Sequence, residues 1–87
     1  MKWWYIYVIK SEKDKNWYTG YTNDLNRRLL EHNTGKTFST KSRLPFKLIY
    51  SEACLNQEDA KAREKYLKSG MGKRYIKNRL KYFLIED

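Results

Sequence analysis

The sequence predicts an α/β fold of the α+β type: a small, three-stranded, mainly antiparallel sheet flanked by helices. Two observations lead to this prediction. Two short runs of aromatic and β-branched residues, joined by a polar segment of hairpin length, precede a helical segment, a third strand-like run and two more helical segments. The 87 residues are 40% hydrophobic and 16% aromatic, which suffices for one small core filled with large rings. We therefore expect residues 1–87 to form a single domain.

The first two strands are expected to form a hairpin. Residues 3–9 are a continuous apolar run, which is typical of a strand buried on both faces, and alternation along it sends Tyr7 to one of these faces. Residues 11–16 are polar and turn-like, and residues 17–22 read as the returning strand. Gly20 inside this strand indicates close approach by another backbone or a ligand, or serves only sheet packing.

The first helix is expected to end near residue 33. Either residue of the pair 23–24 can cap its start. In a helix, Arg28 and His32 fall on the side of the leucines that must face the sheet, whereas Arg27 falls on the opposite side. A purely solubilising arginine would more often share the side of Arg27, so the position of Arg28 favours a functional role.

A basic loop and a third strand follow this helix. Residues 34–43 are polar and basic, and Pro45 introduces a strand from residue 46 to about residue 51. Residues 56–69 open with a capping asparagine and acidic residues, as a helix start does, and Gly70 suits the position just past a helix end.

The longer of the two later helices carries a candidate functional carboxylate. Ala60 and Leu67 mark its inward stripe, and Glu64 projects from the border between this stripe and a lysine-rich face. Residues 71–72 are expected to link it to a last helix at about residues 73–85.

The charge of the chain favours a polyanionic partner. Nineteen basic residues against 10 acidic ones give a formal net charge of +9, so nucleic acid is the favoured partner and a merely solvated surface the alternative. The basic residues that we expect to contact nucleic acid are Lys36, Lys41, Arg43, Lys68, Lys73, Arg74 and Lys77.

Cysteine content and hydropathy exclude several other classes. Cys54 is the only cysteine, so the chain forms no internal disulfide, which is compatible with a reducing cytoplasm. Cys54 and His32 are too few for a structural zinc site, which needs about four ligands. No segment is apolar over the roughly 18 residues of a spanning helix, and no signal-peptide cleavage pattern follows the first apolar run. We expect a cytoplasmic protein without membrane contacts.

Two tyrosine triplets carry a resemblance to a known family. The triplets at residues 5–7 and 18–20 read Tyr-Ile-Tyr and Tyr-Thr-Gly, and Tyr18 follows Tyr7 by 11 positions. They resemble the motifs of GIY-YIG nuclease domains, with tyrosine in place of the first glycine and threonine in place of the second isoleucine. The chain is most similar to the short single-domain bacterial members related to the excision-repair nuclease.

The rest of the chain extends this resemblance. The helix of residues 24–33 contains the family's Arg-x-x-x-His pattern as Arg28 and His32, and residues 60–68 resemble the later helix that carries the metal-binding glutamate, here Glu64. Single motifs are weak signals, whereas their order and spacing together are a strong one. The resemblance implies a GIY-YIG endonuclease-like fold, and its relation to the excision-repair nuclease suggests DNA repair, while recombination and defence against mobile elements stay open as pathways.

The resemblance implies a one-metal mechanism of DNA phosphodiester hydrolysis. Such a reaction needs an activated water and stabilisation of negative charge on the phosphoryl group. Glu64 would hold one Mg²⁺ or Mn²⁺ ion, Arg28 would clamp the phosphate, and His32 would orient a tyrosine or the phosphate. Tyr7 or Tyr18 would accept the proton of the attacking water. The products would carry 5′-phosphate and 3′-hydroxyl ends.

A purely structural role remains open for each of these residues, and a second function for the whole chain. Tyr7 and Tyr18 suit ordinary strand packing, Arg28 a surface ion pair, His32 a hydrogen bond at a helix end, and Glu64 an ion pair. The possible partners of Glu64 in such an ion pair are Arg63, Lys65 and Lys68.

The alternative function is a nucleic-acid-binding module that cleaves poorly or not at all. A third possibility is an RNA partner, since aromatic side chains stack on unpaired bases. The substrate structure, the choice of base and the oligomeric state stay open.

Overall fold

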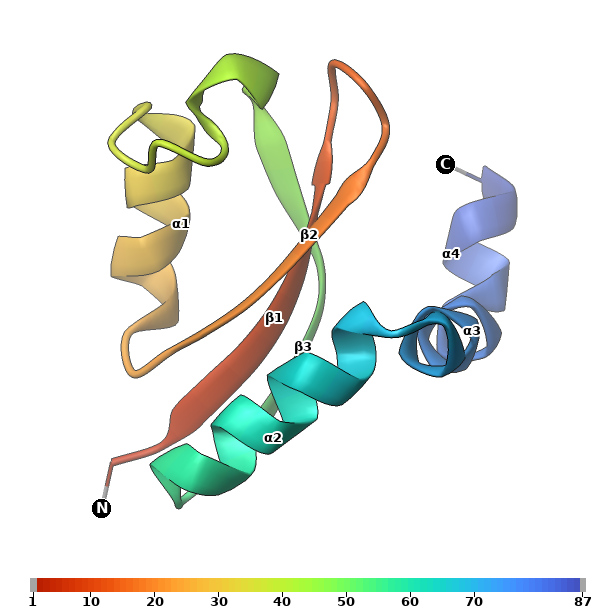
Figure 1. The fold of residues 1–87 in the computed structure, drawn as a ribbon. Coiled ribbons are helices and arrows are strands. Elements are labelled where there is room, and N and C mark those ends of the chain that lie inside the picture. The colour runs from red at the N-terminus through yellow and green to blue at the C-terminus, as the bar shows by residue number, and fades with distance from the viewer. Residues whose placement is uncertain (1, 87) are drawn as a thin grey trace.

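Within residues 2–86, the three strands and the first two α-helices follow in the order that the sequence predicts, whereas the expected last helix is divided into two. The structure is a computed structural model that describes residues 2–86. The elements are β1 (Trp4–Ser11), β2 (Trp17–Thr22), α1 (Leu25–Asn33), the 3₁₀ turn η1 (Lys41–Arg43), β3 (Phe46–Cys54), α2 (Gln57–Lys68), α3 (Gly70–Arg79) and α4 (Lys81–Glu86) (Figure 1). The fold class, a small antiparallel sheet flanked by helices, is confirmed.

The sheet is antiparallel throughout, with β1 in the centre. The strand order is β2-β1-β3, so β2 lies at one edge and β3 at the other. Tyr7 of β1 lies opposite Gly20 of β2 and opposite Ser51 of β3. β3 is longer than expected and extends to Cys54, because it continues to pair with β1 as far as Trp4.

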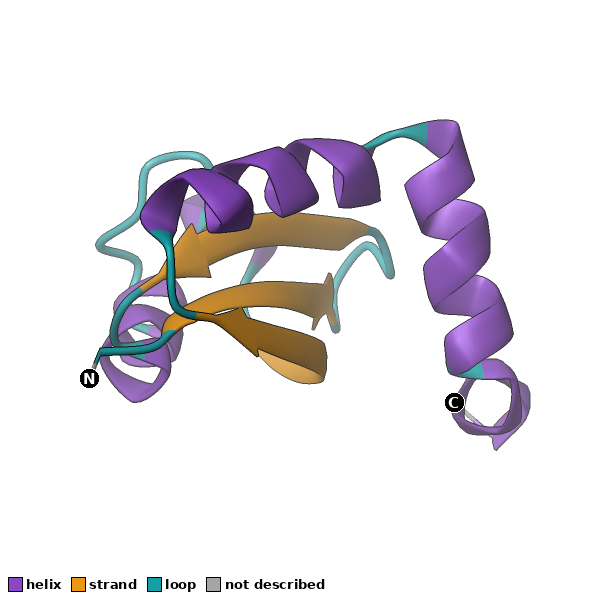
Figure 2. Cartoon of the chain, turned by 90° about the horizontal axis from the view of Figure 1, so that it is seen from below, coloured by secondary structure: helices purple, strands orange, loops and turns teal. Residues whose placement is uncertain are grey.

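Helices cover both faces of the sheet, which explains why β1 is buried on both sides. On one face, Ile6 and Val8 pack with Ala60, Leu67 and other residues of α2 and α3. On the other face, Tyr7, Ile9 and Phe46 form a second cluster against which leucines of α1 pack. Figure 2 shows α2 and α1 on opposite sides of the sheet. Alternation along β1 therefore assigns each side chain to one of the two helical layers.

The start of α1 is fixed by a side-chain cap. Asp24 is the N-cap residue, and its carboxylate accepts a hydrogen bond from the backbone N–H of Arg27 at 3.1 Å. The helix ends at Asn33, whose side-chain amide makes two hydrogen bonds to the backbone of Phe46, at 2.7 and 3.1 Å. The helix is thus tied at its C-terminal end to the first residue of β3.

The prediction that residues 71–72 form a link between the last two helices is wrong. Gly70 does not terminate α2 but opens α3, and residues 71–72 are helical. The reason is Ser69, which ends α2 and also caps α3 by accepting a hydrogen bond from the N–H of Gly72 at 3.2 Å. The final helical segment is also interrupted at Leu80, which separates α3 from α4. None of the helices within residues 2–86 is long and apolar enough to cross a membrane.

Candidate functional site

The ring of Tyr7, the first tyrosine of the site, lies against the backbone of Gly20 in the edge strand β2. A Cβ atom on Gly20 would lie 2.5 Å from Oη and 2.7 Å from Cζ of Tyr7, which is closer than any stable contact. The close approach expected at Gly20 is therefore that of a side chain, the ring of Tyr7. Only a residue without a side chain at this position of β2 lets the Tyr7 hydroxyl occupy this place.

A chain of hydrogen bonds runs from Tyr7 into the loop after α1. The Tyr7 hydroxyl lies 2.8 Å from Nε2 of His32, and Nδ1 of His32 lies 2.8 Å from Oγ1 of Thr40. The Thr40 hydroxyl in turn donates to the carbonyl of Thr37 at 3.4 Å. Because its proton is directed to Thr37, Thr40 accepts from His32, which puts the imidazole proton on Nδ1. Nε2 then accepts the hydrogen bond that Tyr7 donates.

His32 is an uncharged imidazole at neutral pH. Its side chain is completely buried, which confirms that it lies on the inward side of α1. Burial, and secondarily the nearby positive charge of Arg28, lower the pKa of His32 from 6.5 to about 4. The ring is therefore a hydrogen-bond acceptor for Tyr7 with a free lone pair on Nε2.

Three charged or polar groups act on the Tyr7 hydroxyl. Burial raises the pKa of Tyr7 above 10.0, and the neighbouring Arg28 guanidinium opposes this effect, while Tyr18 and Glu64 raise the pKa further. The structure thus places His32 against the Tyr7 hydroxyl and Tyr18 against His32, with the charges of Arg28 and Glu64 near enough to affect the pKa of Tyr7.

Arg28 and Tyr18 line the exposed side of Tyr7 and His32. Arg28 interacts with the Tyr7 hydroxyl and forms an ion pair with Glu31, Nη1 to Oε1, at 3.0 Å. About a third of its side chain remains accessible, at 32%. The Tyr18 ring meets the His32 ring edge to face, with centroids 5.1 Å apart. Tyr18 is less buried than Tyr7, so its ring forms part of the wall of the site.

Glu64 approaches the site from the opposite face of the sheet. It lies on α2, its side chain is 20% exposed, and its carboxylate pairs with Nζ of Lys68 at 3.3 Å. Of the three ion-pair partners considered for Glu64, the structure selects Lys68, because Arg63 binds Glu52 through two hydrogen bonds of 2.8 and 2.9 Å. The site therefore lies at the edge formed by β2, between α1 and α2.

Glu64 is the one carboxylate that this site offers to a metal ion among the described residues. Within residues 2–86, no group of three or more histidine, cysteine, aspartate or glutamate side chains is placed to hold a metal ion. Mg²⁺ keeps several waters in many nucleotide-processing sites and needs only one or two carboxylates, with substrate phosphate completing the shell. Glu64 fits this kind of weak, substrate-completed site and does not fit a permanently loaded one.

The basic residues that were expected to contact nucleic acid fall into two groups. Lys36, Lys41 and Arg43 belong to the loop around η1, which lies beside α1, whereas Lys68, Lys73, Arg74 and Lys77 belong to the end of α2 and to α3 (Figures 1 and 2). Arg43 is engaged within the fold, since it pairs with Asp14 at 2.9 Å and lies over the Phe46 ring. Lys73 and Lys77 instead line a surface cleft.

Sequence reasoning missed Thr40. It is fully buried and holds the His32 ring, yet it stands in a loop with other hydroxyl residues at similar positions. Nothing in the spacing distinguishes it from Thr37 or Ser39, because only the folded path of the loop brings it to Nδ1.

Comparison with known proteins connects this geometry to a family. The family model described as the GIY-YIG catalytic domain matches residues 3–81. The match includes both tyrosine triplets, Arg28, His32 and Glu64. A GIY-YIG catalytic domain suggests nuclease-like activity, a nucleic-acid substrate and use of a divalent metal.

Small bacterial proteins are similar to this chain over most of its length. The UPF0213 protein YazA of Bacillus subtilis is 45% identical over 65 residues, which are 74% of this chain and 65% of that protein. The UPF0213 protein SAG0778 of Streptococcus agalactiae is 48% identical over 65 residues, 74% of this chain and 73% of that protein. The chain thus spans about two thirds of the length of these curated relatives.

A solved structure supports the fold. The solution NMR structure of the UPF0213 protein BH0048 from Bacillus halodurans is 35% identical and superimposes with a TM-score of 0.53, over 85% of this chain and 81% of that chain. The names of these relatives assign no activity to them.

Proposed function

This chain belongs to the GIY-YIG family, in the UPF0213 group of small bacterial proteins, and from this premise we propose that it is a metal-dependent endonuclease that hydrolyses DNA phosphodiester bonds. The observation that carries the proposal is the Tyr7 hydroxyl held by His32 at 2.8 Å beside the partly exposed guanidinium of Arg28, with the carboxylate of Glu64 near enough to raise the pKa of Tyr7. A phosphate clamp, a metal-binding carboxylate and a proton acceptor are the three groups that this reaction requires.

Tyr7 is the proton acceptor in this proposal. As water attacks phosphorus, Oη of Tyr7 takes a proton from that water, and the hydroxyl proton of Tyr7 passes to Nε2 of His32 along the 2.8 Å hydrogen bond. The P–O3′ bond breaks, the 3′-oxygen takes a proton from solvent, and the products carry 5′-phosphate and 3′-hydroxyl ends. Tyr18 shapes the wall of the site beside His32.

Arg28 would bind the phosphate whose bond is broken. Its planar guanidinium suits two parallel hydrogen bonds to phosphate oxygens, and its partial exposure leaves it accessible. A phosphate bound there also offsets the positive charge that helps to keep the pKa of His32 low. Substrate binding therefore makes His32 a better proton acceptor at the moment when Tyr7 needs one.

Glu64 would hold the divalent ion, together with waters and the substrate phosphate. When bound, the ion would stabilise the negative charge that develops on the phosphoryl oxygens. Lys68, the present partner of Glu64, would be released from its 3.3 Å ion pair and become available to a neighbouring phosphate. This exchange would let Lys68 serve both as an ion-pair partner and as a nucleic-acid contact.

Cleavage of labelled DNA with defined products tests the proposal. Duplex, single-stranded, flap and branched substrates would be incubated with Mg²⁺, Mn²⁺ or EDTA, and the product ends would be tested by ligation. We expect cutting only with a divalent ion and products that a ligase accepts. Cutting that persists in EDTA, or products without 5′-phosphates, would contradict the mechanism.

The second candidate function is a nucleic-acid-binding module that does not cleave. The observation that favours it is the single carboxylate of the site, already paired with Lys68 in the described part of the chain. Such a module would bind DNA with a strong salt dependence and give no metal-dependent products on any substrate of the panel.

A further inference from the structure

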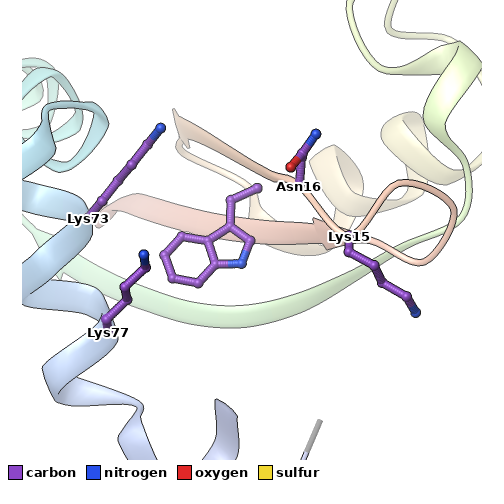
Figure 3. Close-up of a pocket in the computed structure, with 5 residues that line it drawn as sticks. Lys15, Asn16, Lys73 and Lys77 are labelled. Carbon is purple, nitrogen blue, oxygen red and sulfur yellow. The ribbon is translucent and has the colours of Figure 1, made fainter.

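A cleft separate from the tyrosine cluster opens between the β1–β2 hairpin and α3. It has a volume of about 330 Å³ and is lined by Lys15, Asn16, Trp17, Lys73 and Lys77. Figure 3 shows Lys73 and Lys77 projecting from α3 on one side of the cleft, with Lys15 and Asn16 of the hairpin on the other. Its walls come from two elements that are far apart in the sequence.

The charge of this cleft is not neutralised by neighbouring carboxylates. In the part of the chain that the structure describes, no ion pair involves Lys15, Lys73 or Lys77. Three other functional candidates, Arg28, Arg43 and Lys68, each pair with an acidic residue. Three unpaired ammonium groups around one hollow attract an anion, and a flexible polyanion most of all.

The cleft also presents an aromatic surface. Trp17 is partly buried, packs against the core cluster of Ile6, Val8 and Leu67, and contributes the only ring among the lining residues. Aromatic side chains bordered by lysines are the common means of holding unpaired bases, because every base offers a flat face for stacking. A base within a duplex is stacked on both faces and presents no free face to Trp17.

The cleft and the proposed catalytic site share the edge strand β2 but face opposite sides of the sheet. Trp17 packs on the side of α2 and α3, whereas the next residue, Tyr18, packs with Tyr7 on the side of α1, and Gly20 lies two residues beyond Tyr18. Three strand residues span about 10 Å. This distance corresponds to about three nucleotides at the roughly 3.4 Å rise of a stacked strand, and to fewer in an extended one.

We propose that this cleft binds an unpaired nucleotide next to the phosphate that is cleaved. The base stacks on Trp17, Lys73 and Lys77 contact the adjoining phosphates, and the strand then crosses the edge of the sheet at β2 to reach the side of Tyr7. The position of the scissile phosphate rests on the proposed function, whereas the binding of an unpaired nucleotide does not. The substrate class is therefore nucleic acid with a single-stranded segment, such as a flap, a gap or a free strand.

Equilibrium binding without cleavage tests this proposal. Fluorescence anisotropy would be measured in EDTA with labelled single-stranded and duplex oligonucleotides, each as DNA and as RNA. Trp17→Leu keeps apolar bulk but removes the aromatic face, and we expect it to weaken single-strand binding about ten- to hundredfold and duplex binding less than about twofold. Trp3→Leu is the matched control, since Trp3 is a 47% exposed tryptophan away from the cleft. The single strand that binds more tightly, DNA or RNA, identifies which of the two the cleft prefers.

Two further measurements keep the test independent of folding. Trp17→Phe retains a ring and should keep most of the affinity, with circular dichroism as the check on its fold. The unaltered protein would also be tested with a series of single strands, each carrying one abasic site at a different position. Binding should weaken only when the abasic site stands at one or two adjacent positions. Equal losses for Trp3→Leu and Trp17→Leu, equal losses on duplex and single strand, or no sensitive abasic position would overturn the proposal. Trp17-dependent binding by a protein that never cuts would overturn the nuclease alone.

Discussion

At the scale of single residues, the Tyr7 hydroxyl depends on two neighbours that take no part in the proposed chemistry. Gly20 leaves the space that the tyrosine ring occupies, and Thr40 holds the His32 ring that accepts the hydrogen bond from Tyr7. The sequence indicates a close approach at Gly20, because a glycine inside a strand is unusual. It gives no sign of Thr40, whose role arises from the path of the loop.

Gly20→Ala should lower the cleavage rate by about 100-fold, because displacement of a reacting group by about 1 Å has effects of this size. The added methyl would lie 2.5 Å from Oη of Tyr7 and force the hydroxyl away from Arg28. Gly70→Ala is the control, since a Cβ there meets nothing within 4 Å. A Gly20→Ala protein with a native circular dichroism spectrum and an unchanged rate would refute this arrangement of Tyr7.

Buried His32 should make the protein sensitive to acid. The unfolded chain binds a proton at the ordinary histidine pKa of 6.5, whereas folded His32 binds one only near pH 4. Between these values acid favours the unfolded chain, so the free energy of unfolding should fall by about 3 kcal/mol as the pH drops through this window. Denaturant titrations across this range would measure it. His32→Gln should lose this part of the dependence, and parallel curves for the two proteins would contradict the burial of a neutral imidazole.

At the scale of elements, two helices on opposite faces supply the site. α1 carries Arg28 and His32 one turn apart, and α2 carries Glu64 at the border of its buried stripe. Helical periodicity predicts both arrangements from sequence, since residues one turn apart share a face. It cannot predict that Glu64 lies near enough to Tyr7 to raise the pKa of its hydroxyl, because this depends on how α2 crosses the sheet.

The junction of α2 and α3 shows a second limit of sequence reasoning. Two glycines lie near it, and the exposed Gly70 resembles a helix stop, although Gly72 is the constrained one. A Cβ on Gly72 would collide with the carbonyl of Tyr66 and the backbone of Leu67. The tertiary contact of two helices, rather than a local turn, decides which glycine is required.

Gly72→Ala should destabilise the protein by about 2 kcal/mol or more, since the collision involves backbone that cannot move aside. A loss of this size lowers the melting temperature by roughly 8–16 °C in a domain of this length. Gly70→Ala should leave the melting temperature nearly unchanged, because a Cβ there has open space. Calorimetry of the two variants would decide, and equal melting temperatures would contradict the close packing of α2 on α3.

At the scale of the whole molecule, the sheet edge at β2 concentrates the proposed function. The Tyr7 hydroxyl, the Trp17 cleft and the approach of Glu64 all lie along this strand, and β3 at the opposite edge carries none of the proposed residues. The net charge of +9 predicts a polyanion partner without its location. Only the fold shows which basic residues pair with acids, such as Arg43 and Lys68, and which line the cleft, such as Lys73 and Lys77.

Binding of duplex DNA should weaken steeply with salt. With roughly five phosphate contacts, log affinity against log salt should have a slope near about −4 to −5. Removal of one contacting lysine by Lys73→Gln should make the slope shallower by about one. Lys61→Gln, on the exposed side chain that pairs with Glu58, should leave the slope unchanged. A slope near zero for the unaltered protein would contradict any nucleic-acid function.

The most direct test of the nuclease is the single-turnover cleavage rate of Glu64→Gln with Mg²⁺ on the best substrate of the panel. The matched control is Glu58→Gln, a 79% exposed glutamate on the same helix. We expect Glu64→Gln to cut at least about 100-fold more slowly than the unaltered protein, a loss typical of removing one charge-stabilising group. Glu58→Gln should cut at the normal rate, and all three proteins should bind DNA equally. Equal cleavage by Glu64→Gln and Glu58→Gln would show that this site does not carry the activity.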